Sequence, residues 1–141
     1  MKINFQKISE DVKIPSFAHN GDAGMDIYSN EDTSIEAGEI KAISTDIKIE
    51  LEKGYVALIW DKSGLALNNG IKVMGGVIDS TYRGEIKIIL NNLSKDVFKV
   101  EKGSKVAQML IQKVECPDIE VVEDLSETKR GRGGFGSTGL K

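Results

Sequence analysis

The sequence has little that would place the protein outside the cell or in a membrane. Its single cysteine, Cys116, excludes an internal disulfide and a cysteine-based zinc cluster, which fits a reducing compartment. No apolar run approaches the roughly 20 residues that a membrane-spanning helix requires. The segment from Met1 to Phe5 also lacks the apolar core of a signal peptide. We therefore expect a soluble cytoplasmic protein that does not bind membranes.

The sequence also lacks the excess of positive charge that is typical of nucleic-acid-binding proteins. The formal net charge of its 141 residues is -3, so any attraction to phosphate must be local, and we expect no direct binding to nucleic acid. The charges are unevenly distributed: residues 115–127 hold six acidic residues and no basic one, whereas all charged residues after 127 are basic. The length suits one domain, which we divide into a body (1–128) and a C-terminal arm (129–141).

Helix signals are scarce, because only Ser63–Asn69 has a pattern that suits a helix of one or two turns. Elsewhere the pattern is that of strands. Apolar and polar residues alternate over Ile47–Leu51, and Tyr55–Trp60 and Ile86–Leu90 are short apolar runs separated by turn residues. This spacing predicts an all-β sandwich, jelly roll or small barrel. The edges of its sheets must be closed or covered by neighbouring chains.

The last twelve residues combine five glycines with two arginines, two hydroxyl side chains and one aromatic ring. So many glycines disfavour a helix or strand, and order must come from a ligand or partner. Ser137, Thr138 and the glycine N–H groups are donors for an anion, Arg130 can bind two phosphate oxygens, and Phe135 can stack on a nucleobase. These features are typical of a lid over a nucleotide, although a disordered tail that binds polyanions fits the arm equally well.

A second candidate site lies in Gly75–Glu85, between two strand-like runs. The pattern predicts a hairpin with a carboxylate at its turn. Its paired glycines would let a flat polar base approach the backbone, Asp79 is a candidate general base, and Tyr82 can present its ring to a sugar. A structural interpretation also fits, in which the glycines form a bulge, Asp79 caps a turn and Tyr82 is half-buried.

Three shorter patterns add candidates for binding phosphate or a cation. The amides at Ser63, next to the cationic Lys62, can bind phosphate, although Ser63 also fits an ordinary helix N-cap. Asp26 follows a glycine turn, where it can orient a cation or a hydrated metal. Gln108 stands on a predicted strand and can donate its amide to phosphate, although a solvated position fits as well.

Taken in order, these five segments resemble the five motifs of the trimeric dUTP diphosphatases (dUTPases), from Ala23 to Gly139. The most specific elements are Gly76-Val77-Ile78-Asp79 with Tyr82-Arg83-Gly84, and Arg130-Gly131 with Gly133 to Gly139. The resemblance implies a β-clip-like jelly roll that assembles as a homotrimer, with three chains building each active site. In the family, the flexible C-terminal arm of one subunit closes over the pocket of another.

The resemblance also implies an enzyme that hydrolyses dUTP to dUMP and pyrophosphate with Mg²⁺, which limits uracil in DNA and supplies dUMP for thymidylate synthesis. By the same resemblance, Asp79 would activate the attacking water, Tyr82 would carry the deoxyribose and exclude ribose, and Asp26 would act on the metal through water. The other implied substrate-binding residues are Gly76, Val77 and Ile78 for uracil, Lys62, Ser63, Gly64 and Gln108 for phosphates, and Arg130, Phe135, Gly136, Ser137 and Thr138 from the arm.

One departure from the family pattern lies in the second motif, where Asp61-Lys62 replaces the usual Pro-Arg. Lysine keeps the charge but lacks the planar fork of arginine. Two alternative functions fit parts of the pattern. A dCTP deaminase shares the jelly roll, but the glycine lid argues against it. A dUTPase-like regulatory module would bind the nucleotide in order to control a partner protein, and Asp79, Tyr82 and Phe135 together favour the enzyme instead.

Overall fold

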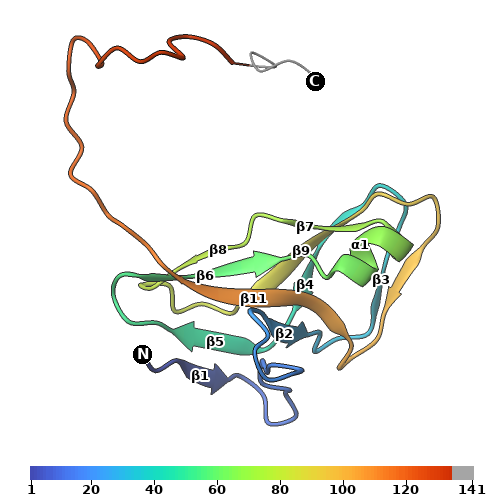
Figure 1. The fold of residues 1–141 in the computed structure, drawn as a ribbon. Helices are drawn as coiled ribbons and strands as arrows, with labels where there is room; N and C mark the ends of the chain where they lie inside the picture. Colours follow the sequence, from blue (N-terminus) through green and yellow to red (C-terminus); the bar gives the residue numbers. More distant parts are fainter. Residues whose placement is uncertain (135–141) are drawn as a thin grey trace.

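The computed structural model describes residues 1–134, which form an all-β body with one short helix (Figure 1). The elements follow in the order β1 (Asn4–Lys7), β2 (Met25–Tyr28), β3 (Thr33–Ile35), β4 (Ile40–Ser44), β5 (Ile47–Glu50), β6 (Tyr55–Trp60), α1 (Ser63–Asn69), β7 (Ile71–Met74), β8 (Val77–Asp79), β9 (Lys87–Asn92), β10 (Phe98–Val100) and β11 (Lys105–Lys113). The predicted all-β jelly roll and the predicted helix are both confirmed.

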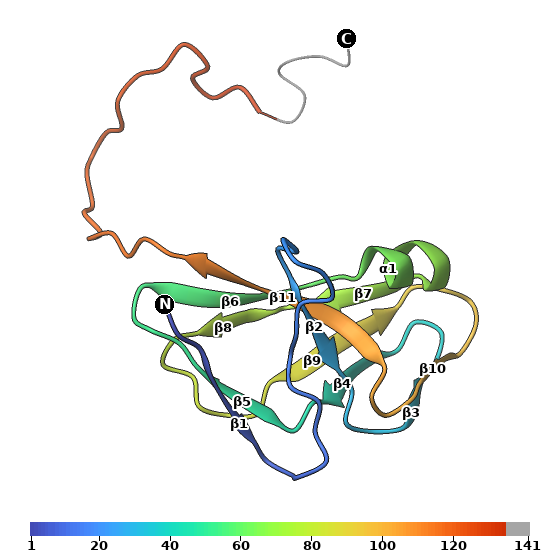
Figure 2. The same cartoon turned by 60° about the horizontal axis from the view of Figure 1, so that its bottom comes forward.

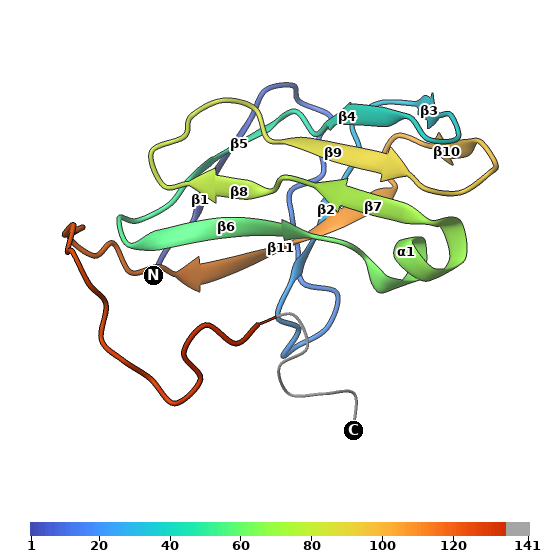
Figure 3. The ribbon, with the colours of Figure 1, turned by 90° about the horizontal axis from the view of Figure 1, so that it is seen from above.

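Every strand pair is antiparallel, and the pairs form two larger sheets and two small ribbons. The larger sheets have the strand orders β2-β11-β6-β8 and β4-β9-β7, and the ribbons pair β1 with β5 and β3 with β10. Seen from above, β7 and β8 lie nearly end to end between β6 and β9 (Figure 3). The chain therefore passes from one sheet to the other at the glycine pair between them, Gly75-Gly76.

The predicted hairpin across residues 75–85 is wrong. β8 pairs with β6, whereas β9 pairs with β4 and β7, so the two strands that flank the turn belong to different sheets. The turn itself is present, because the Tyr82 N–H donates to the Asp79 carbonyl oxygen over 3.0 Å. A hydrophobic pattern predicts strands on both sides of a turn, but it does not say which neighbours they pair with.

Successive residues of a strand point to opposite faces of the sheet. The inward-facing residues form the core between the sheets. On β9, for example, Ile88, Leu90 and Asn92 are buried, while Lys87 points outward. Removing each large aliphatic side chain from water contributes about 1.5–3 kcal/mol to folding. This packing holds the two sheets, and the loops between them, in fixed relative positions.

Helix α1 ends at Gly70, whose φ of 66° is left-handed and whose N–H donates to the carbonyl oxygen of Leu65. A side chain at Gly70 would also approach the backbone, since its Cβ would lie 3.1 Å from the Ser94 nitrogen. Within residues 1–134, no helix is long and apolar enough to cross a membrane.

The segment after β11, residues 114–134, extends away from the sheets without helix or strand (Figures 1 and 2). Three of its apolar side chains lie in solvent, with exposed fractions of 94% for Ile119, 94% for Val121 and 87% for Leu125.

Candidate active site

Asp79 is the last residue of β8 and stands at the rim of an open hollow of about 550 Å³, a volume that suits a small ligand. The wall is largely apolar, with Val77 and Ile78 from β8 and Ile89 from β9. Tyr82 completes the rim beside Asp79. The structure thus brings together Asp79, the predicted general base, Tyr82, the predicted sugar platform, and the backbone of residues 76–78, which is predicted to bind the nucleobase.

Gly76, directly before β8, lies against Ile59 of β6. Its carbonyl oxygen accepts a hydrogen bond of 2.7 Å from the Ile59 N–H, and its φ is 100°. A Cβ at this position would lie 2.8 Å from the Ile59 carbonyl oxygen. Glycine is required here because the backbone is left-handed and lies against a neighbouring strand.

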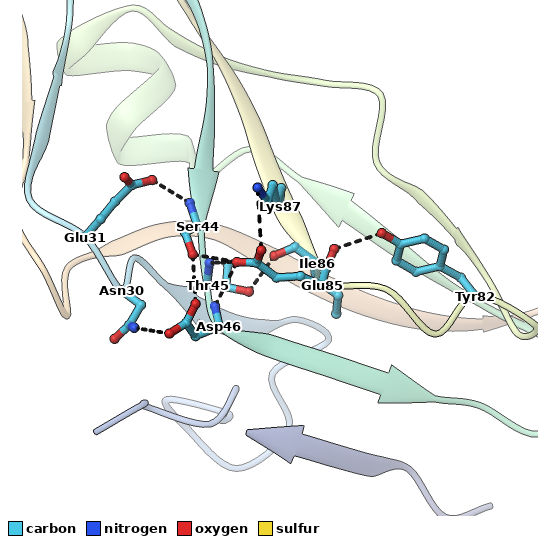
Figure 4. A network of polar contacts seen from close by, with 9 residues as sticks. All are labelled: Asn30, Glu31, Ser44, Thr45, Asp46, Tyr82, Glu85, Ile86 and Lys87. Atoms are coloured by element: carbon cyan, nitrogen blue, oxygen red, sulfur yellow. Dashed lines mark hydrogen bonds and ion pairs between the residues drawn. The ribbon is translucent and has the colours of Figure 1, made fainter. Parts of the chain in front are cut away.

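Tyr82 is fixed by the loop in which it stands (Figure 4). Its hydroxyl donates to the Glu85 carbonyl oxygen over 2.9 Å, and the Arg83 guanidinium donates to the carbonyl oxygens of Ser80 and Tyr82. Gly84 leaves room for the ring, because a Cβ there would lie 2.6 Å from the Tyr82 Cζ and nearer still to the hydroxyl. Tyr82 is 43% exposed, so part of its side chain is accessible to a ligand.

The side chain of Glu85 anchors this loop to the corner between β4 and β5 (Figure 4). One carboxylate oxygen accepts hydrogen bonds from the Ser44 hydroxyl at 2.5 Å, the Thr45 N–H at 3.2 Å and the Asp46 N–H at 3.1 Å. Burial opposes ionisation of Glu85, but these hydrogen bonds and the nearby Lys87 ammonium lower its pKa below the ordinary value. Sequence reasoning missed Glu85, since its role depends on a corner about 40 positions away.

A second cluster of polar side chains surrounds Asp26, which is buried on β2 with an exposed fraction of 5%. Lys62 pairs with one carboxylate oxygen, and the Lys105 Nζ lies 2.6 Å from the other. Burial opposes ionisation of Asp26, but the two ammonium groups lower its pKa overall. Sequence reasoning identified Asp26 and Lys62 but missed Lys105, which no local pattern distinguishes from a solvated lysine.

Gln108 and Asp61 belong to the same cluster. The Gln108 amide donates to the Asp61 carbonyl oxygen over 2.8 Å, while the Asp61 carboxylate accepts a 2.5 Å hydrogen bond from the Val73 N–H and pairs with Lys72. Burial opposes ionisation of Asp61, but Lys72 and the Val73 N–H lower its pKa. Asp61 therefore ties the segment before α1 to β7.

Ser63 is the first residue of α1, and its side chain is exposed. The N-cap is Lys62, whose φ and ψ of -84° and 123° are extended, and it makes no side-chain capping bond. The interpretation of Ser63 as an N-cap is therefore wrong, and its hydroxyl makes no hydrogen bond within residues 1–134. Gly64 next to it borders open space, because a Cβ there would meet nothing within 4 Å.

The two clusters lie at opposite ends of β6. Asp79 pairs with Val56 near the start of this strand, whereas Gln108 pairs with Trp60 at its end. Four steps along a strand span about 13 Å. A single chain therefore does not bring the Asp79 hollow and the Lys62–Gln108 cluster together at one small reacting centre.

Comparison with known proteins decides the family. A family model described as dUTPase matches residues 10–139. The chain is 50% identical over 140 residues to the deoxyuridine 5′-triphosphate nucleotidohydrolase of Clostridioides difficile, with 98% of each chain covered. It is 49% identical to that of Trichodesmium erythraeum, with 99% of each covered.

The chain belongs to the dUTPase family.

Solved dUTPases share the fold over nearly the whole chain. The dUTPase of Staphylococcus bacteriophage 80alpha with dUpNHpp gives a TM-score of 0.93 at 27% identity, and 99% of each chain is covered. A mutant dUTPase from phage phi11 of S. aureus gives a TM-score of 0.84 at 25% identity, with 90% of this chain and 100% of that chain covered, and is described as coordinating a structural Mg(II) ion. The predicted dUTPase resemblance is confirmed.

The C-terminal dUTPase motif is described only in part. Arg130 lies in the described region, where its Nε donates to the Gly133 carbonyl oxygen over 2.8 Å in an exposed turn. Phe135, Gly136, Ser137 and Thr138 lie outside the described residues, so their roles stay predictions.

Proposed function

We propose that this protein hydrolyses dUTP to dUMP and pyrophosphate. The observation that carries the proposal is Asp79, a carboxylate at the rim of a nucleoside-sized hollow beside Tyr82, in a chain that belongs to the dUTPase family over residues 10–139. The reaction would limit uracil in DNA and supply dUMP for thymidylate synthesis. We place it in the cytoplasm, with no role for nucleic acid or membrane as partner.

In the proposed mechanism, the Asp79 carboxylate accepts a proton from a water molecule as the water oxygen attacks the α-phosphorus in line. The new bond joins the water oxygen to phosphorus, the bond from the α-phosphorus to the bridging oxygen breaks, and pyrophosphate leaves. Asp79 suits this role because its carboxylate is exposed at the rim and no ion pair involves it among the described residues. It also contacts the 3′-hydroxyl in this proposal.

Tyr82 selects the sugar in this proposal. The hydrogen bond to Glu85 and the absence of a Cβ at Gly84 support a fixed ring position. A ring packed against the 2′ carbon leaves no room for a ribose hydroxyl, and an unpaired hydroxyl pressed there would cost about 1–3 kcal/mol. The backbone of Gly76, Val77 and Ile78 would read the uracil by hydrogen bonds.

The triphosphate would lie on the cluster around Asp26. Lys62, Ser63, Gly64 and Gln108 would bind its α- and β-phosphates, which the open surroundings of Ser63 and Gly64 allow. The residues proposed to come from the arm are Arg130, Ser137 and Thr138 for the γ-phosphate, and Phe135 with Gly136 for the cover over the base. On this proposal residues 129–141 act as the lid of a body formed by 1–128.

The donor set suits Mg²⁺ that the nucleotide itself holds. Within residues 1–134, no three His, Cys, Asp or Glu side chains gather to bind a metal, and both oxygens of Asp26 already pair with lysines. Protein-bound Mg²⁺ commonly keeps several waters and binds one or two carboxylates together with substrate phosphates. Asp26 would therefore touch the ion only through water. When bound, the ion neutralises phosphate charge and orients the triphosphate.

A homotrimer reconciles the separation along β6 with one reacting centre. Asp79 of one chain would meet Ser63 and Gln108 of a second, and the arm of a third would close the site. The exposed apolar side chains of the segment before the arm, such as Ile119 and Val121, support burial against another subunit. Sedimentation should give three times the mass of one chain, and a stable monomer with full activity would contradict the shared site.

The first experiment measures pyrophosphate release from dUTP, dTTP, dCTP and UTP with Mg²⁺ and identifies the nucleotide product. We expect strong preference for dUTP.

Asp79→Asn should lower kcat by at least about 10²-fold and leave dUpNHpp affinity nearly unchanged, because the substitution removes the general base and keeps the shape of the side chain. Asp96→Asn, an exposed carboxylate away from the hollow, is the matched control. Turnover by Asp79→Asn at the wild-type rate would refute the assignment.

A further inference from the structure

A β-bulge in β11 places Lys105 on the same face of the sheet as Gln108. Lys105 pairs with Tyr28 of β2 and Gln108 pairs with Asp26, so three steps along β11 match two steps along β2. In a regular strand, residues three apart point to opposite faces, because side chains alternate. The extra residue reverses that alternation, and bulges are common where a side chain is re-aimed beside a functional site.

The bulge brings a second lysine to Asp26, which already pairs with Lys62. The Lys105 and Lys62 side chains keep exposed fractions of 46% and 28%, whereas that of the Asp26 side chain is 7%. The anion is therefore covered, and both ammonium groups border solvent. The charges of Lys62, Lys105 and Asp26 sum to +1, and the Asp22 carboxylate also acts on Lys105.

The second lysine exceeds what Asp26 requires, since one ammonium group already balances one carboxylate. Each ammonium has three N–H donors, and within residues 1–134 Lys62 donates one hydrogen bond to Asp26 while Lys105 forms only an ion pair with it. Their remaining donors point to an anion from solution. Gln108 adds an amide on the same face, so several donors gather at this place.

We propose that Lys105 is a further substrate-binding residue, which together with Lys62 contacts the triphosphate of the bound nucleotide. The inference rests on the proposed function. Lys62 stands where the family usually has arginine, and a single ammonium is a point charge without the two-point fork. Two lysines held on the two oxygens of Asp26 supply two separated charges in a fixed arrangement. Asp26 thereby positions both cations.

The test compares a ligand that has the triphosphate with one that lacks it. Binding of dUpNHpp is measured by calorimetry in EDTA, and deoxyuridine is measured as an inhibitor of dUTP hydrolysis. Lys105→Met should weaken dUpNHpp binding about 10- to 100-fold, since a hydrogen bond to a charged group is lost. Deoxyuridine inhibition should change by less than about twofold, because base and sugar contacts remain. Lys105→Arg should restore most of the affinity.

Two controls separate phosphate binding from support of the fold. Lys99→Met removes an exposed lysine on β10 that makes no ion pair within residues 1–134, and it should leave both ligands unaffected. Lys105→Met is then repeated in an Asp26→Asn background. A lysine that serves only to balance Asp26 has no further effect once the acid is gone, whereas a phosphate-binding lysine still causes its loss.

The outcomes distinguish the inference from the proposed function. Equal weakening of dUpNHpp and deoxyuridine, no weakening of either, or no effect in the Asp26→Asn background would each overturn the role of Lys105 while wild-type hydrolysis stands. Failure of the wild-type protein to bind dUpNHpp and to hydrolyse dUTP would overturn the proposed function, and the inference with it.

Discussion

Gly84 should control sugar selection without touching the substrate, because it makes the space for the Tyr82 ring. In Gly84→Ala, the new Cβ would lie 2.6 Å from the Tyr82 Cζ, whereas ordinary van der Waals contact begins at 3.4 Å. The ring must therefore retreat by about 0.8 Å at Cζ, and further at the hydroxyl. Gly84 has no positive φ, so the perturbation is purely steric.

The cost in stability should be small, because the Tyr82 ring is 43% exposed and can swing toward solvent. We expect to lose only the 2.9 Å hydrogen bond to the Glu85 carbonyl oxygen, about 1 kcal/mol of unfolding free energy. The effect on selectivity should be larger. A displaced ring no longer holds the position that excludes a ribose hydroxyl, and that exclusion is worth about 1–3 kcal/mol, or roughly 5- to 150-fold.

The assay is the ratio of kcat/KM for dUTP to that for UTP, measured for wild type, Gly84→Ala and Tyr82→Phe. Tyr82→Phe removes the hydrogen bond and keeps the ring, so it separates the two contributions. We expect the ratio to fall in Gly84→Ala and to fall less in Tyr82→Phe. Urea titration shows whether Gly84→Ala is folded. An unchanged ratio in the folded variant would refute the idea that ring position selects the sugar.

Two further predictions concern stability. Gly76→Ala should lower the unfolding free energy by about 2 kcal/mol or more in urea titration, because the φ of Gly76 is 100° and an added Cβ would lie 2.8 Å from the Ile59 carbonyl oxygen. Gly134→Ala is the control, because a Cβ at Gly134 meets nothing within 4 Å. Equal stability of the two variants would contradict the reasoning. Glu85 has a pKa lowered from 4.5, so its contribution to stability is present above pH 4.5 and lost as pH falls through the lower folded value. Glu85→Gln should be less stable than wild type at pH 7, with a difference that shrinks below pH 4.5, and a constant difference would count against the Ser44–Glu85 network.

The sequence allowed the strands and the short helix to be predicted because both are local patterns. The alternation over Ile47–Leu51 and the helix pattern over Ser63–Asn69 each depend on a few neighbouring residues, and the tertiary structure agrees with both. The pairing of β8 with β6 depends on contacts about 20 positions apart, so the predicted hairpin was wrong. Residue pattern does not encode such pairing directly.

The candidate site was predictable to the extent that its residues stand in motifs. Asp79 and Tyr82 meet at one hollow as their spacing indicated. Glu85 and Lys105 were not predictable, because one depends on the β4–β5 corner and the other on a bulge that changes which way a side chain faces. Both act through geometry that no short segment determines.

The crossing at Gly75-Gly76 has a consequence for protein engineering. The hollow takes wall residues from both sheets, such as Ala42 from β4 and Val77 from β8, so no contiguous piece of sequence carries it. Grafting residues 75–85 onto another scaffold should therefore transfer the side chains without the recognition. Core substitutions that change how the two sheets pack should therefore alter the shape of the hollow without touching its lining residues.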